Sequence, residues 1–355
     1  MLFRSLLWQN RVAPGPESSF GAFDIGLNHP APPGDAGIAP LAMAPAWPRH
    51  DNALVLRAHT AGTLPAEDVK LSVSITQPAL FSSDCGTFTD PNAQEVSLPA
   101  VDPAAGAVAM TGFKARPGSL GVRMYSPADP AGGGEASNVV ASRRAFLFFT
   151  AGQASRRRTH FTVQANEGCA AETTFHVAPD TVPPGWKVSV SPEVIAIAPG
   201  AQAEVAVTVT PPPGAAPGEN AEIGIKVLEA EETPSIAPTD QPVEPIMLQH
   251  LDSIGTMEVS ARVVGDPAAV NLACGAAPAG GTIAVSGNIA PLAPDSSLLV
   301  ELTSFGANQT HLLTTGADGS FTDTFTRGRA RHGHVQAFWP GDATHAPVAS
   351  TRCAF

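Results

Sequence analysis

The chain has 355 residues, of which 43% are hydrophobic and 15% are charged. Two or three domains with packed cores are therefore expected, and wholesale disorder is excluded. The formal net charge of -12 at pH 7 also argues against a nucleic acid or an anionic membrane as a partner, because both need cationic patches.

No membrane span is predicted either, because the sequence contains no run of 18 or more apolar residues. The first residues, Met1 to Ser5 followed by Trp8, lack the apolar stretch and the small-residue cleavage site of a signal peptide. We therefore expect the chain to be the C-terminal part of a larger exported protein. Its 33 glycines and 35 prolines suit many short strands that are connected by turns.

Residues 1–150 are expected to form a first β-sandwich. Apolar and polar residues alternate in N-A-L-V-L-R-A-H-T at 52–60 and in D-V-K-L-S-V-S-I-T at 68–76. Further strands are predicted at 23–27, 94–98, 107–113, 119–125 and 138–149. The two alternating runs, with A-G-T-L-P-A-E between them, resemble bacterial CARDB-like domains, although the usual Asn-Arg-Gly of that motif is replaced by residues 58–62.

Residues 151–265 are expected to form a second β-sandwich, with the clearest strand pattern of the chain. The run A-Q-A-E-V-A-V-T-V-T at 201–210 puts Val205, Val207 and Val209 on one face of a half-buried strand. Three prolines follow directly and end the ladder, because proline has no N–H to donate. Neighbouring strands are predicted at 186–190, 194–197, 221–228 and 256–263.

The order of motifs in this second unit is P-G-W, S-P, A-P-G, the alternating valines and then P-P-x-x-A-x-P-G. Over about residues 158–265 it resembles the NEW3-type bacterial immunoglobulin-like module. The resemblance implies a structural spacer of the kind that often lies beside the catalytic domains of secreted glycosidases and peptidases. It implies no catalytic residues for this chain.

Residues 229–255 interrupt the second unit and are long for a connection in a sandwich. Their first half is acidic and rich in proline, and residues 245–251 are compatible with a helical turn. We expect either a surface excursion that packs onto its own domain or a partner-binding loop. The basic run at residues 156–158 is interpreted as a solvated linker between the first two domains.

Residues 266–355 are expected to form a third β-sandwich, with strands at 282–287, 298–303, 311–315, 321–325 and 334–338. It contains two turn segments, T-G-A-D-G-S-F, which ends at Phe321, and A-F-W-P-G-D-A-T-H-A-P near the end. They resemble bacterial immunoglobulin-like repeats of the Big_3 type, although His345 stands where an aromatic residue is usual. Asp318 and Asp342 are interpreted as turn residues, because aspartate bonds its own backbone there.

None of the four cysteines belongs to a C-x-x-C pair, which argues against a zinc site or a thioredoxin-like motif. Cys274 ends the first strand of the last domain and Cys353 ends its last strand, so a disulfide between them is predicted. On the chain-entropy estimate this disulfide adds about 4 kcal/mol of stability. Cys85 and Cys169, which lie in different expected domains, either form a second disulfide or remain two buried thiols.

The sequence contains no nucleophile elbow, zinc-protease motif, phosphate-binding loop or calcium-binding loop. His332 and His334 are interpreted as exposed histidines at a strand end rather than as metal ligands. The best candidate for ligand binding is Trp339 with Phe338 and His345, since a tryptophan ring stacks on a sugar if it is exposed.

We therefore expect an all-β rod of three tandem immunoglobulin-like β-sandwiches, without a cofactor. The expected function is a non-catalytic accessory, spacer or adhesion region of a larger secreted or cell-surface bacterial protein, with a hydrolase domain upstream. The expected partner is a glycan or a cell-surface protein. The alternative is a carbohydrate-binding module that uses Trp339.

Overall fold

The computed structural model describes residues 6–7, 25–29, 44–60, 70–76, 79–81, 94–97, 107–114, 120–125, 140–153, 155–169, 171–234, 247–265, 267–275, 280–305, 307–327 and 332–355. Every regular element in these ranges is a β-strand, so the all-β fold class is confirmed. We refer to residues 1–150, 151–265 and 266–355 as regions 1, 2 and 3; their division into three domains stays a prediction. The described residues include no helix with the length and hydrophobicity needed to cross a membrane.

The strands of region 1 follow the predicted strands, with two short additions at residues 6–7 and 79–81. They are β1 (Leu6–Leu7), β2 (Ile25–Leu27), β3 (Asp51–Thr60), β4 (Lys70–Thr76), β5 (Ala79–Phe81), β6 (Gln94–Ser97), β7 (Ala107–Lys114), β8 (Leu120–Tyr125) and β9 (Val140–Thr150). Strand β3 pairs with β1, β2 and β7, whereas β4 pairs with β6 and β8.

Regions 2 and 3 contain the remaining strands. Region 2 has β10 (Arg157–Gln164), β11 (Thr173–Thr181), β12 (Lys187–Ser191), β13 (Val194–Ile197), β14 (Gln202–Thr210), β15 (Asn220–Pro234) and β16 (Met247–Val264). Region 3 has β17 (Ala269–Cys274), β18 (Thr282–Ala290), β19 (Ser297–Ser304), β20 (Ala307–Thr314), β21 (Ser320–Thr326), β22 (Gly333–Trp339), β23 (Val348–Ala349) and β24 (Cys353–Ala354).

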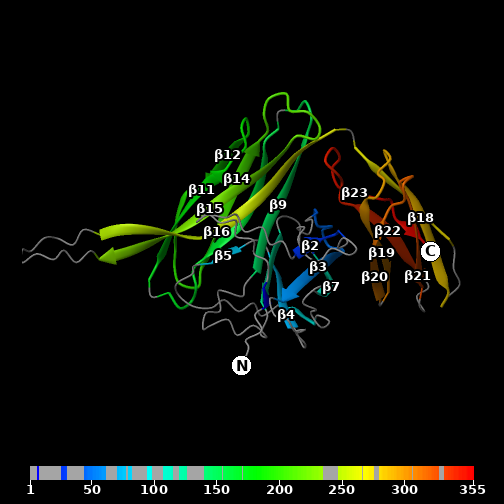
Figure 1. Ribbon diagram of the computed structural model, residues 1–355, viewed down its shortest axis with the longest axis horizontal. Coiled ribbons are helices and arrows are strands. Elements are labelled where there is room, and N and C mark those ends of the chain that lie inside the picture. The colour runs from blue at the N-terminus through cyan, green and yellow to red at the C-terminus, as the bar shows by residue number, and fades with distance from the viewer. Residues whose placement is uncertain are drawn as a thin grey trace, which may run out of the picture.

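Strand β9 connects regions 1 and 2 without a break in its β-structure (Figure 1). Its first half, from Val140 to Arg144, pairs antiparallel with β8. Its second half, from Arg144 to Thr150, pairs parallel with β16. One strand therefore belongs to both halves of an eight-stranded sheet with the order β13-β11-β15-β16-β9-β8-β4-β6.

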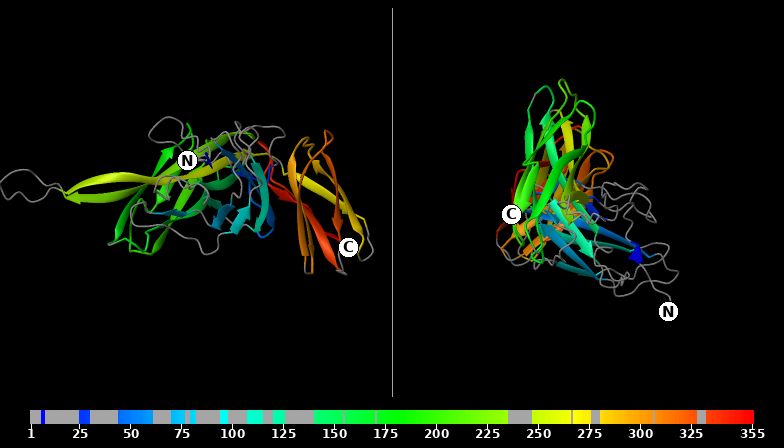
Figure 2. Two further views of the ribbon diagram at one scale, coloured as in Figure 1. Left: turned by 60° about the horizontal axis from the view of Figure 1, so that its bottom comes forward. Right: turned by 90° about the vertical axis from the view of Figure 1, so that its left-hand side faces the viewer.

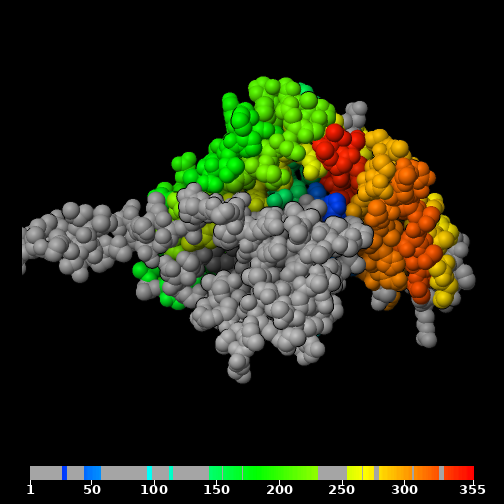
Figure 3. Space-filling view, viewed as in Figure 1, coloured from blue at the N-terminus to red at the C-terminus, as the bar shows by residue number. Residues whose placement is uncertain are grey.

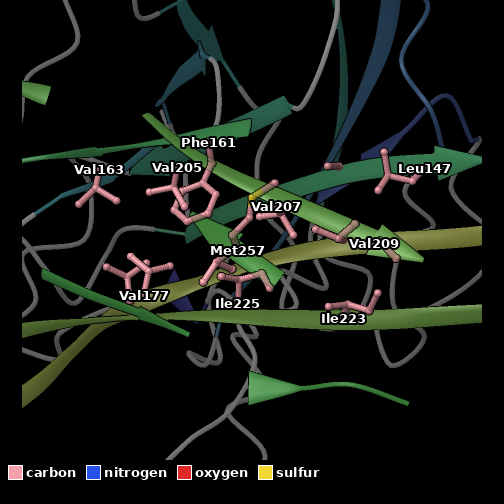
Figure 4. Packing of buried hydrophobic residues seen from close by; sticks show 14 of the residues in the cluster. Leu147, Phe161, Val163, Val177, Val205, Val207, Val209, Ile223, Ile225 and Met257 are labelled. Carbon is pink, nitrogen blue, oxygen red and sulfur yellow. The ribbon is translucent and has the colours of Figure 1, made fainter. Parts of the chain in front are cut away.

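The core of region 2 lies between this sheet and a second one with the order β12-β14-β10-β5 (Figure 4). Val205, Val207 and Val209 of β14 are fully buried on one face, which confirms the period-2 prediction. Trp186 is buried as well, with its ring in an edge-on contact with Phe149 at the end of β9. Strand β5 of region 1 pairs parallel with β10, so region 1 contributes strands to both sheets of this sandwich.

The basic run at residues 156–158 is not a linker, contrary to our expectation. Arg157 and Arg158 begin β10 and pair with Val209 and Thr208 of β14. All three arginine side chains are exposed, as predicted. The error arises because arginine at the solvated end of a strand breaks the alternation on which the strand prediction depends.

Strands β15 and β16 extend the sheet into a long two-stranded ribbon, which projects away from the rest of the molecule (Figures 1 and 2). Their pairing runs from Asn220 opposite Arg262 to Pro234 opposite Met247. Residues 247–251 are thus part of a strand, and the helical turn considered for this segment is wrong there. Glu229 and Ile254 of the 229–255 segment still pack on the sandwich of region 2, whereas its strands continue from there as the projecting ribbon, up to Pro234 opposite Met247.

Region 3 is a sandwich of two sheets, β17-β18-β21 and β20-β19-β22-β23, with β24 added to β22. Its core contains Phe321, Phe325 and Trp339. Gly287 of β18 lies so close to the neighbouring strands of its own sheet that a Cβ atom there would overlap the carbonyl oxygen of Asn271 in β17 and the ring of Phe321 in β21. Only glycine leaves room for this approach.

Region 3 does not extend the molecule as a rod. Its β19 and β20 lie against β3 of region 1, while Gly265, directly after β16 of region 2, donates its N–H to Thr344 of region 3 (Figures 1 and 3). Each region therefore contacts the other two, and the expectation of a linear rod is wrong. This closed arrangement creates a junction between regions 1 and 3.

Candidate functional site: the junction around Glu301

The region 1 side of the junction is the loop of residues 44–50, which two buried asparagines hold in place. The side-chain amide of Asn52 donates to the carbonyl oxygens of Trp47 and His50, at 3.0 and 2.9 Å. Its Oδ1 accepts from the backbone N–H of Trp47 at 2.6 Å and from Asn28 at 2.9 Å. Asn28 in turn binds the backbone of Pro45 and Ala53. Buried polar groups that are satisfied in this way fix one loop conformation.

This loop presents two rings to region 3. Trp47 and His50 stack with their ring centroids 3.7 Å apart, and Trp47 also stacks on Phe338 of β22 at 5.2 Å. Leu299 and Ala53 complete an apolar cluster that belongs to both regions. Since apolar burial is the main favourable term in association, this cluster supplies most of the attraction between regions 1 and 3.

Glu301 of β19 lies beside the stack and is only 4% exposed. Its Oε1 is 3.0 Å from Nδ1 of His50 and accepts from the hydroxyl of Thr303 at 2.9 Å. Its Oε2 accepts from the backbone N–H of Asp51 at 2.8 Å. A buried carboxylate is costly unless it is paired and hydrogen-bonded, and here two of its partners come from region 1.

His334 of β22 lies within electrostatic reach of this group. Its pKa is lowered by burial first and then by the positive charge of Arg352, while Glu301 acts in the opposite direction. Glu301 thus joins the two regions through His50 and Asp51 of region 1 and Thr303 of its own strand.

A second contact connects region 3 to region 2. The carboxylate of Asp342 accepts from the backbone N–H groups of Thr344 and His345 at 2.7 and 2.8 Å, which closes the turn that the sequence predicts. The carbonyl oxygen of Thr344 accepts from the N–H of Gly265, and that of Asp342 accepts from Arg262. Burial raises the pKa of Asp342, but the hydrogen bonds from Thr344 and His345 outweigh it and lower the pKa overall.

The structure does not leave the residues proposed for ligand binding free. Trp339 is 1% exposed and belongs to the core of region 3, so its ring is not available for stacking on a sugar. Phe338 is buried against Trp47, and His345 is 2.9 Å from Asp342 within the turn. The expectation of an exposed platform at Trp339 is therefore wrong, because Trp339 packs in the core of region 3, Phe338 packs against region 1 and His345 is held in the turn by Asp342.

The predicted disulfide between Cys274 and Cys353 is present, with a Cα–Cα distance of 6.1 Å. It connects β17 of one sheet to β24 of the other. Cys169 is buried in the core of region 2 and is also disulfide-bonded. Its expected partner Cys85 lies outside the described residues, so this pairing stays a prediction.

His332 is exposed and His334 is half-buried, and the described residues hold no group of three side chains that could bind a metal ion. The residues that sequence reasoning missed are Trp47, His50 and Glu301. Of these three, only Glu301 could have been noticed in the sequence. It is the one charged residue in the run S-L-L-V-E-L-T-S and stands between apolar residues. A charge at such a position is rarely buried unless it has partners.

Residues 150–227 match the family described as the NPCBM-associated, NEW3 domain of alpha-galactosidase. The match covers less than half of the chain, and it coincides with part of the segment that resembles NEW3 in sequence. No curated protein matches the chain.

Several solved structures share a distant likeness with this chain. The CupB2 chaperone of Pseudomonas aeruginosa is 13% identical, with 58% of this chain and 96% of that chain covered and a TM-score of 0.23. The D0-D1 domain of intimin is 11% identical over 58% of this chain and 93% of that chain, with a TM-score of 0.21. A Ca2+-stabilised adhesin of an Antarctic bacterium is 14% identical over 86% and 68%, also with a TM-score of 0.21. Likenesses at this level say nothing about what the chain binds.

Proposed function

We propose that this chain is a non-catalytic spacer of a larger secreted or cell-surface bacterial protein, and that it holds a neighbouring domain in a fixed orientation. The observation that carries this proposal is strand β9, which belongs to both halves of one eight-stranded sheet and so joins regions 1 and 2 without a linker. Domains that are joined by flexible linkers move relative to each other by default. A continuous strand that is paired on both sides removes that freedom.

The two contacts of region 3 support the same conclusion. Glu301 and Trp47 attach region 3 to region 1, and the turn at Asp342 attaches it to region 2. Fixing a module at two separate places leaves no hinge at its connection. A spacer that fixes orientation needs this property, whereas a flexible tether does not.

The family match adds a function class to this geometry. It names a NEW3 domain of alpha-galactosidase, so we propose that the neighbouring domain is a hydrolase and that this chain contributes no catalytic group of its own. The disulfide between Cys274 and Cys353 supports a location outside the cytoplasm, since disulfides persist in oxidising compartments. We propose a glycan or a protein of the cell surface as the target of the complete protein.

The alternative function, a carbohydrate-binding module, loses its main support because Trp339 is buried. A glycan array separates the two. The spacer proposal predicts that the chain gives no signal on neutral or charged glycans, and that small-angle X-ray scattering in solution fits one rigid conformation. A specific array signal would favour the binding module, and scattering that requires several conformations would overturn the spacer.

A further inference from the structure

Phe305 is the most exposed large apolar residue that the structure describes, at 99%. It follows Ser304, the last residue of β19, at the tip of the hairpin that leads into β20. Only three other large apolar residues of the described part are clearly exposed, and Leu292 is the next at 64%. An aromatic ring with no protein contact on either face has no role in packing.

The strand ends around this tip contain no acidic side chain. Their described residues are 274–275, 280–284, 303–305, 307–310, 324–327, 332–336 and 350–355, and none of these is Asp or Glu. The described residues of the same set include Arg327, His332 and Arg352. In a chain with a net charge of -12, this end of region 3 is locally cationic.

Several contacts bring these segments together at one end of the sandwich. Ser304 of β19 pairs with Gly333 of β22, and the backbone N–H of Phe355 donates to the carbonyl oxygen of Gly333 at 3.2 Å. Arg327 lies over the ring of Phe355, with its Cζ 5.4 Å from the ring centroid. His332 precedes Gly333 and is exposed, as is Arg352. Phe305 therefore projects from the same end that carries the two arginines.

We propose that this end of region 3 is a docking surface for an anionic lipid bilayer. Phe305 enters the boundary between headgroups and acyl chains, and Arg327 and Arg352 face the lipid phosphates. Interfacial membrane binding depends on this combination of buried apolar area and cationic charge near an anionic surface. The acidic remainder of the chain favours the same orientation, because an anionic bilayer repels it.

The exposure of Phe305 favours a bilayer over a polysaccharide. A sugar stacks on one face of an aromatic ring, and the protein usually supports such a ring through its other face. A ring that is 99% exposed has no such support, but lipid surrounds an inserted side chain on all sides. This inference does not rest on the spacer function, since a rigid spacer with no affinity for membranes would meet every requirement stated above.

Vesicle flotation tests the proposal directly, using the full chain with phosphatidylcholine vesicles and with vesicles that contain phosphatidylglycerol. The chain is expected to float with the anionic vesicles only, and to be released as salt rises well above about 0.1 M, where surface charges are screened. F305S is expected to lower the bound fraction roughly tenfold or more, because the apolar anchor is lost. R352Q is expected to lower it by about fivefold.

Matched controls keep the result specific. L292S removes another exposed apolar side chain and R157Q another exposed arginine, and both are expected to bind anionic vesicles like the wild type. An equal loss of the bound fraction in F305S and L292S, or no binding of the wild type to anionic vesicles, would overturn the proposal. So would binding to a soluble acidic polysaccharide that F305S leaves unchanged, because the ligand would then be a polyanion and not a bilayer.

Discussion

Replacing Glu301 with leucine tests whether regions 1 and 3 form one unit. The substitution keeps a similar volume but removes the acceptor for the N–H of Asp51, for Nδ1 of His50 and for the hydroxyl of Thr303. The hydroxyl can rotate to another partner and the histidine is partly solvated, so the unpaired amide N–H of Asp51 dominates the cost. We expect the free energy of unfolding to fall by about 1–3 kcal/mol, from the typical penalty of an unsatisfied buried group.

The free energy of unfolding is measured by chemical denaturation, with tryptophan fluorescence as the signal because Trp47 lies in the junction. The control is E204L, which removes the carboxylate of an exposed pair, His160 and Glu204 at 3.8 Å. Exposed pairs contribute about 0–1 kcal/mol, so E204L is expected to have little effect. Similar losses in the two variants would refute the conclusion that Glu301 holds the regions together.

Three further predictions concern region 3 and its surroundings. The double variant C274S/C353S is expected to lower the free energy of unfolding, measured by denaturation, by about 4–5 kcal/mol, because the disulfide closes a loop with a sequence separation of 79. Unchanged stability would contradict this. G287A is expected to lower the free energy of unfolding by about 1–3 kcal/mol through overpacking. G112A is the control and is expected to have a smaller effect, because a Cβ atom at Gly112 meets nothing closer than 4.0 Å. The pKa of His334 is lowered in the folded state, so the unfolded chain takes up its proton first. Stability is therefore expected to fall as the pH drops below about 6.5 towards the folded pKa, and H334Q should flatten this fall in thermal melts from pH 7 to pH 5.

The sequence predicted those strands whose alternation is intact. In β14, three valines at period 2 face the core without interruption, and the structure agrees. In β10, exposed arginines begin the strand, and the strand was missed. In β15 and β16, glutamates and prolines hid a long ribbon, because a ribbon that projects into solvent has no buried face to impose a period.

The candidate site could be predicted only in part. Trp339 lies two and four residues after Ala337 and Val335, so the period of β22 already places it on the core face. That signal was outweighed by the Pro-Gly turn that follows it. Phe338 points to the other face, and only the fold reveals that Trp47 covers it. Contacts between segments that are far apart in sequence leave no local pattern.

The central claim is that the three regions form one rigid body, and distance measurement between paired spin labels tests it most directly. Labels at S97C in β6 and N308C in β20 report on regions 1 and 3, and both positions are exposed. A single narrow distance distribution is expected, and E301L should broaden it. A broad distribution in the unaltered junction would show that region 3 moves freely, which contradicts the account of this chain as a rigid spacer.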